Sequence, residues 1–163
     1  MTGTPGSARV SGLKANPIAE PSEMIRTTSK TSQPVPTVIV SRPGIMQRSL
    51  RSSLAACGGI TVIATSGDGL MALRQVTQHR PGMLVIDSNL LDEEVEALLA
   101  GAKTEHPAIR CLVFVRSSQQ EAQVLALGAD AVARRDGSAQ QLQAALARLA
   151  QAAREPQARG PQA

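Results

Sequence analysis

Five short apolar runs, separated by longer segments of helical periodicity, restrict the possible folds of this chain most strongly. The first four runs are rich in Val and Ile, and they are nearly continuous in apolar residues instead of alternating with polar ones. Strands that are buried on both faces of a parallel sheet have this pattern. The runs span residues 37–41, 60–65, 83–87, 109–115 and 131–133.

The segments between and after these runs each place apolar side chains on one face of a helix. Such strand–helix alternation predicts βαβ units with right-handed crossovers, and therefore a doubly wound α/β domain with five parallel strands and five helices. The predicted helical faces are Met46, Leu50, Leu54 and Cys57; Leu70, Leu73 and Val76; Val95, Leu98, Leu99 and Ala102; Val124, Leu125 and Leu127; and Leu142, Leu146 and Leu149.

The domain occupies residues 37–153. Residues 1–36 are rich in Ser, Thr, Pro and Gly without sustained periodicity, which predicts a disordered leader, and residues 154–163 read as a flexible tail. The chain has no signal-peptide pattern and no apolar run long enough to cross a membrane, so we expect a cytoplasmic protein without membrane contact.

Composition argues against nucleic-acid binding by the domain. The formal net charge is +4, but residues 37–153 carry 11 basic and 10 acidic side chains, so three of the four excess positive charges lie in the terminal segments. Phe114 is the only aromatic residue besides the two histidines, which removes the stacking platforms that bind single-stranded nucleic acids. The sequence also lacks the glycine fingerprint of nucleotide-binding doubly wound domains.

Five segments in order resemble the receiver domain of bacterial two-component response regulators. They read VIVSRPGIMQRSLRSSL, GDGLMAL, RPGMLVIDSNL, IRCLVFV and ALGADAVARRDGSAQQLQAAL, and the resemblance extends over roughly residues 37–150. The chain is most similar to receivers that precede helix-turn-helix output domains, but it ends just after the last helical segment, so we expect no output domain. The excess of 14 Arg over 3 Lys fits a high-GC bacterial genome.

The resemblance implies a flavodoxin-like (CheY-like) sheet of order 2-1-3-4-5. It also implies phosphoryl transfer from a histidine kinase to Asp87, which follows the third strand. In the family, an acidic pair after the first strand and the acceptor carboxylate hold Mg²⁺ together with a backbone carbonyl, here that of Asn89. A Thr or Ser after the fourth strand and a Lys after the fifth bind the phosphoryl oxygens.

The chain departs from this pattern at most of its chemical positions. Ser41 and Arg42 replace the acidic pair, Val115 replaces the Thr or Ser, and Arg135 replaces the Lys. Mg²⁺ prefers several oxygen ligands, including carboxylates, and the chain offers Asp87 alone. We therefore predict a metal-free pseudo-receiver without enzymatic activity, in which Arg42 pairs with Asp87 and fills the place of the metal.

Two other interpretations stay open. Asp87 could instead cap the turn into the next helix, a common role for Asp. Alternatively, the chain could be a working single-domain receiver that needs Mg²⁺, with the Arg135 cation and the nearby Ser117 hydroxyl as substitutes.

Protein contact is the output that the resemblance implies. The partner would be a histidine kinase or another regulator, and a homodimer would form through the fourth helix, fifth strand and fifth helix. The residues expected on that face are Val124, Leu127, Val132 and Leu142, with Val132 in place of an aromatic switch residue.

Overall fold

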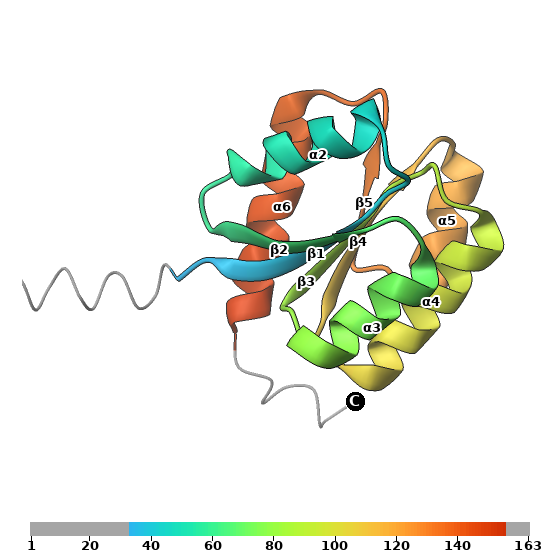
Figure 1. Ribbon diagram of the computed structural model, residues 1–163. Helices are drawn as coiled ribbons and strands as arrows, with labels where there is room; N and C mark the ends of the chain where they lie inside the picture. The colour runs from blue at the N-terminus through green and yellow to red at the C-terminus, as the bar shows by residue number, and fades with distance from the viewer. Residues whose placement is uncertain (1–32, 156–163) are drawn as a thin grey trace, which may run out of the picture. The chain divides into compact units, whose positions relative to one another are not determined.

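The computed structural model describes residues 33–155, in which five strands alternate with five helices (Figure 1). The strands are β1 (Val35–Val40), β2 (Ile60–Ser66), β3 (Met83–Ile86), β4 (Arg110–Val115) and β5 (Ala131–Arg134). The helices are α2 (Ile45–Ala55), α3 (Gly69–His79), α4 (Asp92–Glu105), α5 (Ser118–Ala126) and α6 (Ala139–Arg154).

All five strands join one parallel sheet in the order β2-β1-β3-β4-β5. Helices α2 and α6 cover one face of this sheet, and α3, α4 and α5 cover the other (Figure 1). The predicted doubly wound architecture and its strand order are therefore confirmed.

Each face of the sheet has its own apolar core, because successive strand residues point to opposite faces. Along β1, Val38 and Val40 pack with α3, α4 and α5, whereas Ile39 packs with α2 and α6. Strands β3 and β4 divide their side chains in the same way. This double burial explains why the strands are apolar throughout instead of alternating.

Helices α3 and α4 approach each other closely at Gly101. A Cβ atom added at Gly101 would lie 2.9 Å from a methyl carbon of Leu73, so the glycine makes room for that side chain. Leu73 is thereby packed against the core, between α3 and α4.

Some sequence boundaries need correction. Strand β1 begins at Val35, so two residues of the predicted leader belong to the sheet; the rest of that leader, except Gln33 and Pro34, and most of the predicted tail lie outside the described residues. Three members of the predicted buried faces are exposed instead, namely Met46, Leu70 and Leu125. Within residues 33–155, no helix combines the length and apolarity that a membrane crossing requires.

A comparison of Leu54→Ala with Leu70→Ala tests this assignment of the core. Leu54 is fully buried and Leu70 is 68% exposed. We expect Leu54→Ala to lower the free energy of unfolding by about 2–5 kcal/mol, because it leaves a cavity, and Leu70→Ala to change it by about 0.5 kcal/mol or less. Urea unfolding followed by far-UV circular dichroism measures both, since the chain lacks Trp and Tyr. Equal losses would contradict the assignment.

Candidate functional site

The polar residues that follow β1, β3 and β5 meet at the carboxyl edge of the sheet. Ser41 and Arg42 follow β1, Asp87 follows β3, and Arg135 follows β5. Since parallel strands end at a common edge, these residues come together although they are far apart in the sequence. The site predicted from the sequence is therefore assembled in the fold.

The Asp87 carboxylate is buried, with only 2% of the residue exposed. Its Oδ2 accepts a hydrogen bond from the Ser41 hydroxyl at 2.7 Å. Its Oδ1 accepts from the backbone N–H of Ser88 at 2.6 Å and from Nη1 of Arg135 at 2.8 Å. Both carboxylate oxygens are thus bound by donors from the chain.

Arg135 supplies the positive charge next to Asp87. Besides its ion pair with Asp87, Nη1 donates to the Ser88 hydroxyl at 2.8 Å, so one guanidinium nitrogen joins two residues of the loop after β3. A buried carboxylate is costly without a compensating charge or hydrogen bonds. Arg135 therefore compensates the buried charge of Asp87.

Arg42 does not pair with Asp87, which corrects the prediction from the sequence. Its Nη2 lies 2.6 Å from Oε1 of Glu94, and its Nη1 donates to the Gly67 carbonyl at 2.7 Å and to Oε2 of Glu94 at 3.3 Å. The guanidinium lies towards α4 because Glu94, in the first turn of that helix, offers a carboxylate whose ion-pair partner among residues 33–155 is Arg42. Glu94 was not among the site residues predicted from the sequence.

The pairing of Arg42 with Glu94 ties together three segments around the site. Oε2 of Glu94 also accepts from the backbone N–H of Gly69, the first residue of α3, at 2.7 Å. Burial raises the pKa of the Glu94 carboxyl, but the hydrogen bonds from Gly69 and Arg42, together with the guanidinium charge, outweigh it and hold the pKa below its usual value. We call Arg42, Glu94, Gly67 and Gly69 the Arg42–Glu94 clasp.

Ser41 and Asn89 complete the immediate surroundings of Asp87. Ser41 is fully buried, and its carbonyl accepts a hydrogen bond from Nε2 of Gln47 at 2.6 Å. The Asn89 side chain accepts from the backbone N–H of Arg42 at 3.3 Å and contacts the Ser41 hydroxyl at 3.4 Å. Sequence reasoning missed Gln47, whose contact with the preceding loop has no signal in the sequence pattern.

Val115 and Ser117, the residues considered for the phosphoryl-binding position after β4, make no hydrogen bond with the Asp87 carboxylate. Val115 is the last residue of β4 and is fully buried. Ser117, the suggested substitute, is the N-cap of α5, and its hydroxyl accepts from the backbone N–H of Gln120. The hydroxyls that do lie at Asp87 belong to Ser41 and Ser88, and the latter reaches it through Arg135.

Asp87 does not cap the following helix. The N-cap of α4 is Leu91, which makes no side-chain capping bond. The carboxylate of Asp87 instead faces the strand ends, where Ser41 and Arg135 donate to it. The capping interpretation is therefore wrong.

One residue of the predicted partner face also needs correction. Val124 is buried among the side chains of the α3–α4–α5 core, so it has no surface to offer a partner. Leu127, Val132 and Leu142 are half-buried and pack against the two cores. Of the apolar residues predicted for one face of this helix, Val124 therefore faces the sheet, whereas Leu125 faces the surface.

The residues around Asp87 do not fit a magnesium site. Within residues 33–155, no three His, Cys, Asp or Glu side chains are grouped so that they could hold a metal ion. At the edge itself, Glu94 is turned away into the clasp, and both oxygens of Asp87 face donors. Mg²⁺ needs oxygen ligands that the present donors do not supply.

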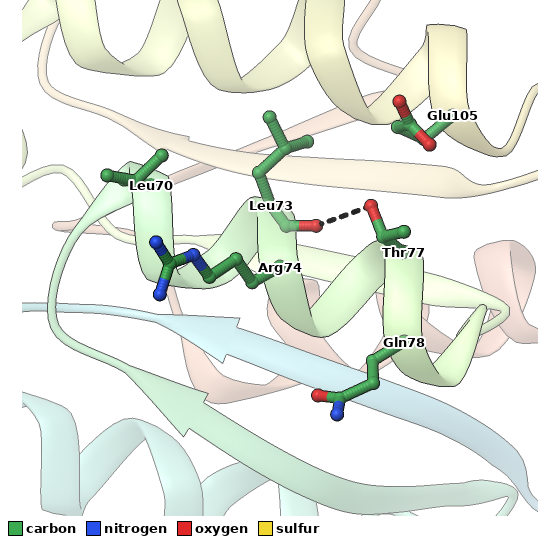
Figure 2. Close-up of a pocket in the computed structure, with 6 residues that line it drawn as sticks. All are labelled: Leu70, Leu73, Arg74, Thr77, Gln78 and Glu105. Carbon is green, nitrogen blue, oxygen red and sulfur yellow. Dashed lines mark hydrogen bonds between the residues drawn. The ribbon is translucent and has the colours of Figure 1, made fainter.

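A shallow apolar groove lies on a different part of the surface, between α3 and the end of α4. Its volume is about 430 Å³, and Figure 2 shows Leu70 and Leu73 along it, with Arg74, Thr77 and Gln78 from α3 and Glu105 from α4. The Thr77 hydroxyl donates to the Leu73 carbonyl at 3.1 Å, so it is satisfied within the helix. This groove does not include Asp87 or its partners.

Comparison with solved structures identifies the fold. The signal receiver domain of the response regulator NarL from Mycobacterium tuberculosis matches with a TM-score of 0.64 at 18% identity, covering 72% of this chain and 96% of that one. A LuxR-family two-component response regulator from Aurantimonas sp. matches with a TM-score of 0.65 at 21% identity, covering 72% and 86%. A protein described as related to pilus assembly, from Burkholderia pseudomallei, matches with a TM-score of 0.62 at 24% identity, covering 72% and 90%.

No protein-family model and no curated protein sequence matches this chain. The structural matches nevertheless show that it has the fold of response-regulator receiver domains, as its sequence motifs indicated.

The substitution Glu94→Gln tests the clasp through its pH dependence. Because the pKa of Glu94 is lower in the folded protein than in the unfolded chain, its stabilising contribution is fully present above the ordinary carboxyl pKa of 4.5 and is lost as the pH falls through the lower folded value. We expect Glu94→Gln to cost about 1 kcal/mol at pH 7, with the difference from wild type shrinking below about pH 4.5.

Urea unfolding between pH 3 and pH 7 measures this difference. Glu93→Gln is the matched control, because Glu93 lies in the same helical turn and is exposed. A deficit of Glu94→Gln that is independent of pH would contradict the role assigned to its charge.

Proposed function

We propose that this protein is an atypical receiver of the two-component type, which acts in the bacterial cytoplasm by protein contact and without Mg²⁺-dependent phosphorylation. One observation supports the proposal above all: the carboxylate in the acceptor position, Asp87, is buried and bound at both oxygens by Ser41, Ser88 and Arg135. An acceptor must present an oxygen to the incoming phosphorus atom. Here both oxygens already accept hydrogen bonds from the chain.

The charge balance of the edge supports the same conclusion. Two guanidinium groups, Arg42 and Arg135, lie where the family brings an acidic pair and a Lys, and each pairs with one carboxylate. Each charge is therefore neutralised by its partner, and no excess of negative charge is left to attract a divalent cation. To bind a metal ion, Glu94 or Asp87 would have to break its ion pair and leave Arg42 or Arg135 without a partner.

The lost hydroxyl at Val115 removes a further part of the phosphoryl-transfer machinery. Transfer depends on donors positioned at the equatorial oxygens of the phosphoryl group. Val115 offers an apolar side chain in this place, and its complete burial shows that the core uses it for packing. Replacement by a hydroxyl would alter the core as well as the site.

For the output we propose a protein partner, either a histidine kinase or another regulator, or a second copy of the chain. The face formed by α5, β5 and α6 would carry this contact through the exposed Leu125 and the half-buried Leu127, Val132 and Leu142. With no aromatic residue at position 132, the face has one arrangement instead of two that phosphorylation would exchange. We propose neither enzymatic activity nor direct nucleic-acid or membrane binding.

The alternative function is that of a working receiver, phosphorylated on Asp87. The contact between Arg135 and Asp87 favours it, since the cation lies where the family Lys would bind the transferred phosphoryl group. The two functions differ in whether Asp87 reacts, which a direct experiment decides.

Incubation of the full chain with Mg²⁺ and a small-molecule phosphodonor, followed by intact-protein mass spectrometry, is that experiment. We expect no phosphoryl adduct on the wild type or on Asp87→Asn, because the acceptor oxygens are engaged and no metal is bound. A base-labile adduct on the wild type that is absent from Asp87→Asn would contradict the proposal and establish the alternative.

A second variant tests whether the missing carboxylates are the cause. Ser41→Asp combined with Arg42→Asp restores an acidic pair beside Asp87, and we expect it to gain binding of millimolar Mg²⁺, measured as a rise in melting temperature. Arg42→Ala is the control, because it removes the clasp without adding a carboxylate, and we expect no metal response from it. A wild-type response equal to that of the double variant would overturn the metal-free assignment.

A further inference from the structure

A second cavity, of about 570 Å³, opens between α2, β5 and α6, and lies outside the proposed function. Ser49 and Ser53 of α2 form one wall, and Leu142 and Arg148 of α6 form another. This volume is within the range of about 300–1,000 Å³ that is usual for small-molecule sites. The groove of Figure 2, by comparison, is smaller and lies on the other side of the sheet, on α3.

The charged groups that line this cavity are mainly cations. Arg134, Arg135 and Arg148 line it, against the single carboxylate of Glu121. Arg135 is engaged by Asp87, so the available charges are those of Arg134 and Arg148.

These two arginines are weakly held. The side chain of Arg148 makes no hydrogen bond or ion pair with any group among residues 33–155. Arg134 lies 3.6 Å from Asp136, whose side chain is 80% exposed, and such an exposed pair contributes little. Guanidinium groups in this condition are free to bind a phosphate through paired N–H donors.

Part of the remaining lining is apolar, beside the polar Ser49, Ser53, Ser138 and Gln141. Phe114, the sole residue of the chain with a benzene ring, faces the cavity together with Val132 and Leu142. A wall of this kind suits the ring of an organic molecule, whereas an inorganic ion would leave it uncovered. A lining that holds both guanidinium groups and apolar side chains suits a ligand with a charged and an apolar part.

We propose that this cavity binds a phosphorylated organic molecule of mononucleotide size, with its phosphate on Arg134 and Arg148 and its ring against Phe114, Val132 and Leu142. The proposal is independent of phosphorylation at Asp87, because neither Arg134 nor Arg148 makes a hydrogen bond or ion pair with that carboxylate. It also needs no glycine fingerprint, since side chains instead of a loop backbone provide the donors.

NMR titration of the full chain with AMP and with GMP tests the proposal. Since the chain has one Phe, no Trp and no Tyr, its aromatic proton spectrum contains only Phe114 and two histidines, and the Phe114 ring reports directly from the cavity. We expect saturable shifts of the Phe114 resonances. Adenosine, which lacks the phosphate, and inorganic phosphate, which lacks the ring, should each bind at least about tenfold more weakly.

Arginine variants locate the binding site. Arg134→Gln and Arg148→Gln should each raise the Kd for the mononucleotide about tenfold, whereas Arg74→Gln, the same charge change at the groove of Figure 2, should leave it unchanged. The proposal is overturned if neither mononucleotide gives a saturable Phe114 shift. It is equally overturned if Arg74→Gln weakens binding as much as Arg148→Gln, which would indicate general charge attraction.

Discussion

The buried carboxylate of Asp87 determines how the carboxyl edge of this domain is built. Placing an ionised carboxylate at 2% exposure costs free energy unless charge and hydrogen bonds compensate. Ser41 comes from the end of β1, Ser88 from the loop after β3 and Arg135 from the end of β5, so compensation requires three strand ends to be in register. The Arg135–Asp87 ion pair and the Ser41 hydrogen bond therefore hold the ends of β1, β3 and β5 in a fixed arrangement.

The Arg42–Glu94 clasp has a comparable role one layer further out. It connects the loops after β1 and β2 with the start of α4. Its side chains are more exposed than that of Asp87, at 38% for Arg42 and 19% for Glu94 against 3% for Asp87. Exposed ion pairs contribute little to stability, so we expect the clasp to stabilise these loops less than the buried Asp87 pair does. In the two pairs each guanidinium is neutralised by one carboxylate. A site that binds a divalent cation needs an excess of negative charge instead.

The sequence predicts the sheet well and the side-chain partnerships less well, for a physical reason. Burial on both faces produces continuous apolar runs, and these located all five strands, with errors of one or two residues at their ends. Arg42 was assigned to Asp87 because both were expected at the same edge, but Glu94, 52 residues away along the chain, competes for the guanidinium from the next helix. Likewise, helical periodicity placed Val124 on an apolar helical face, but it did not show whether Val124 points towards the sheet or towards a partner.

Arg135 is the one residue that belongs both to the Asp87 site and to the lining of the large cavity, and the energetics of its ion pair separate the two. A ligand phosphate that drew Arg135 away would leave Asp87 buried beside Ser41 and Ser88 without its cation, and an uncompensated buried charge of this kind is strongly destabilising. Neither Arg134 nor Arg148 compensates a buried carboxylate. A phosphate that binds through them leaves the Arg135–Asp87 pair intact. Ligand binding in the cavity is therefore independent of any reaction at Asp87.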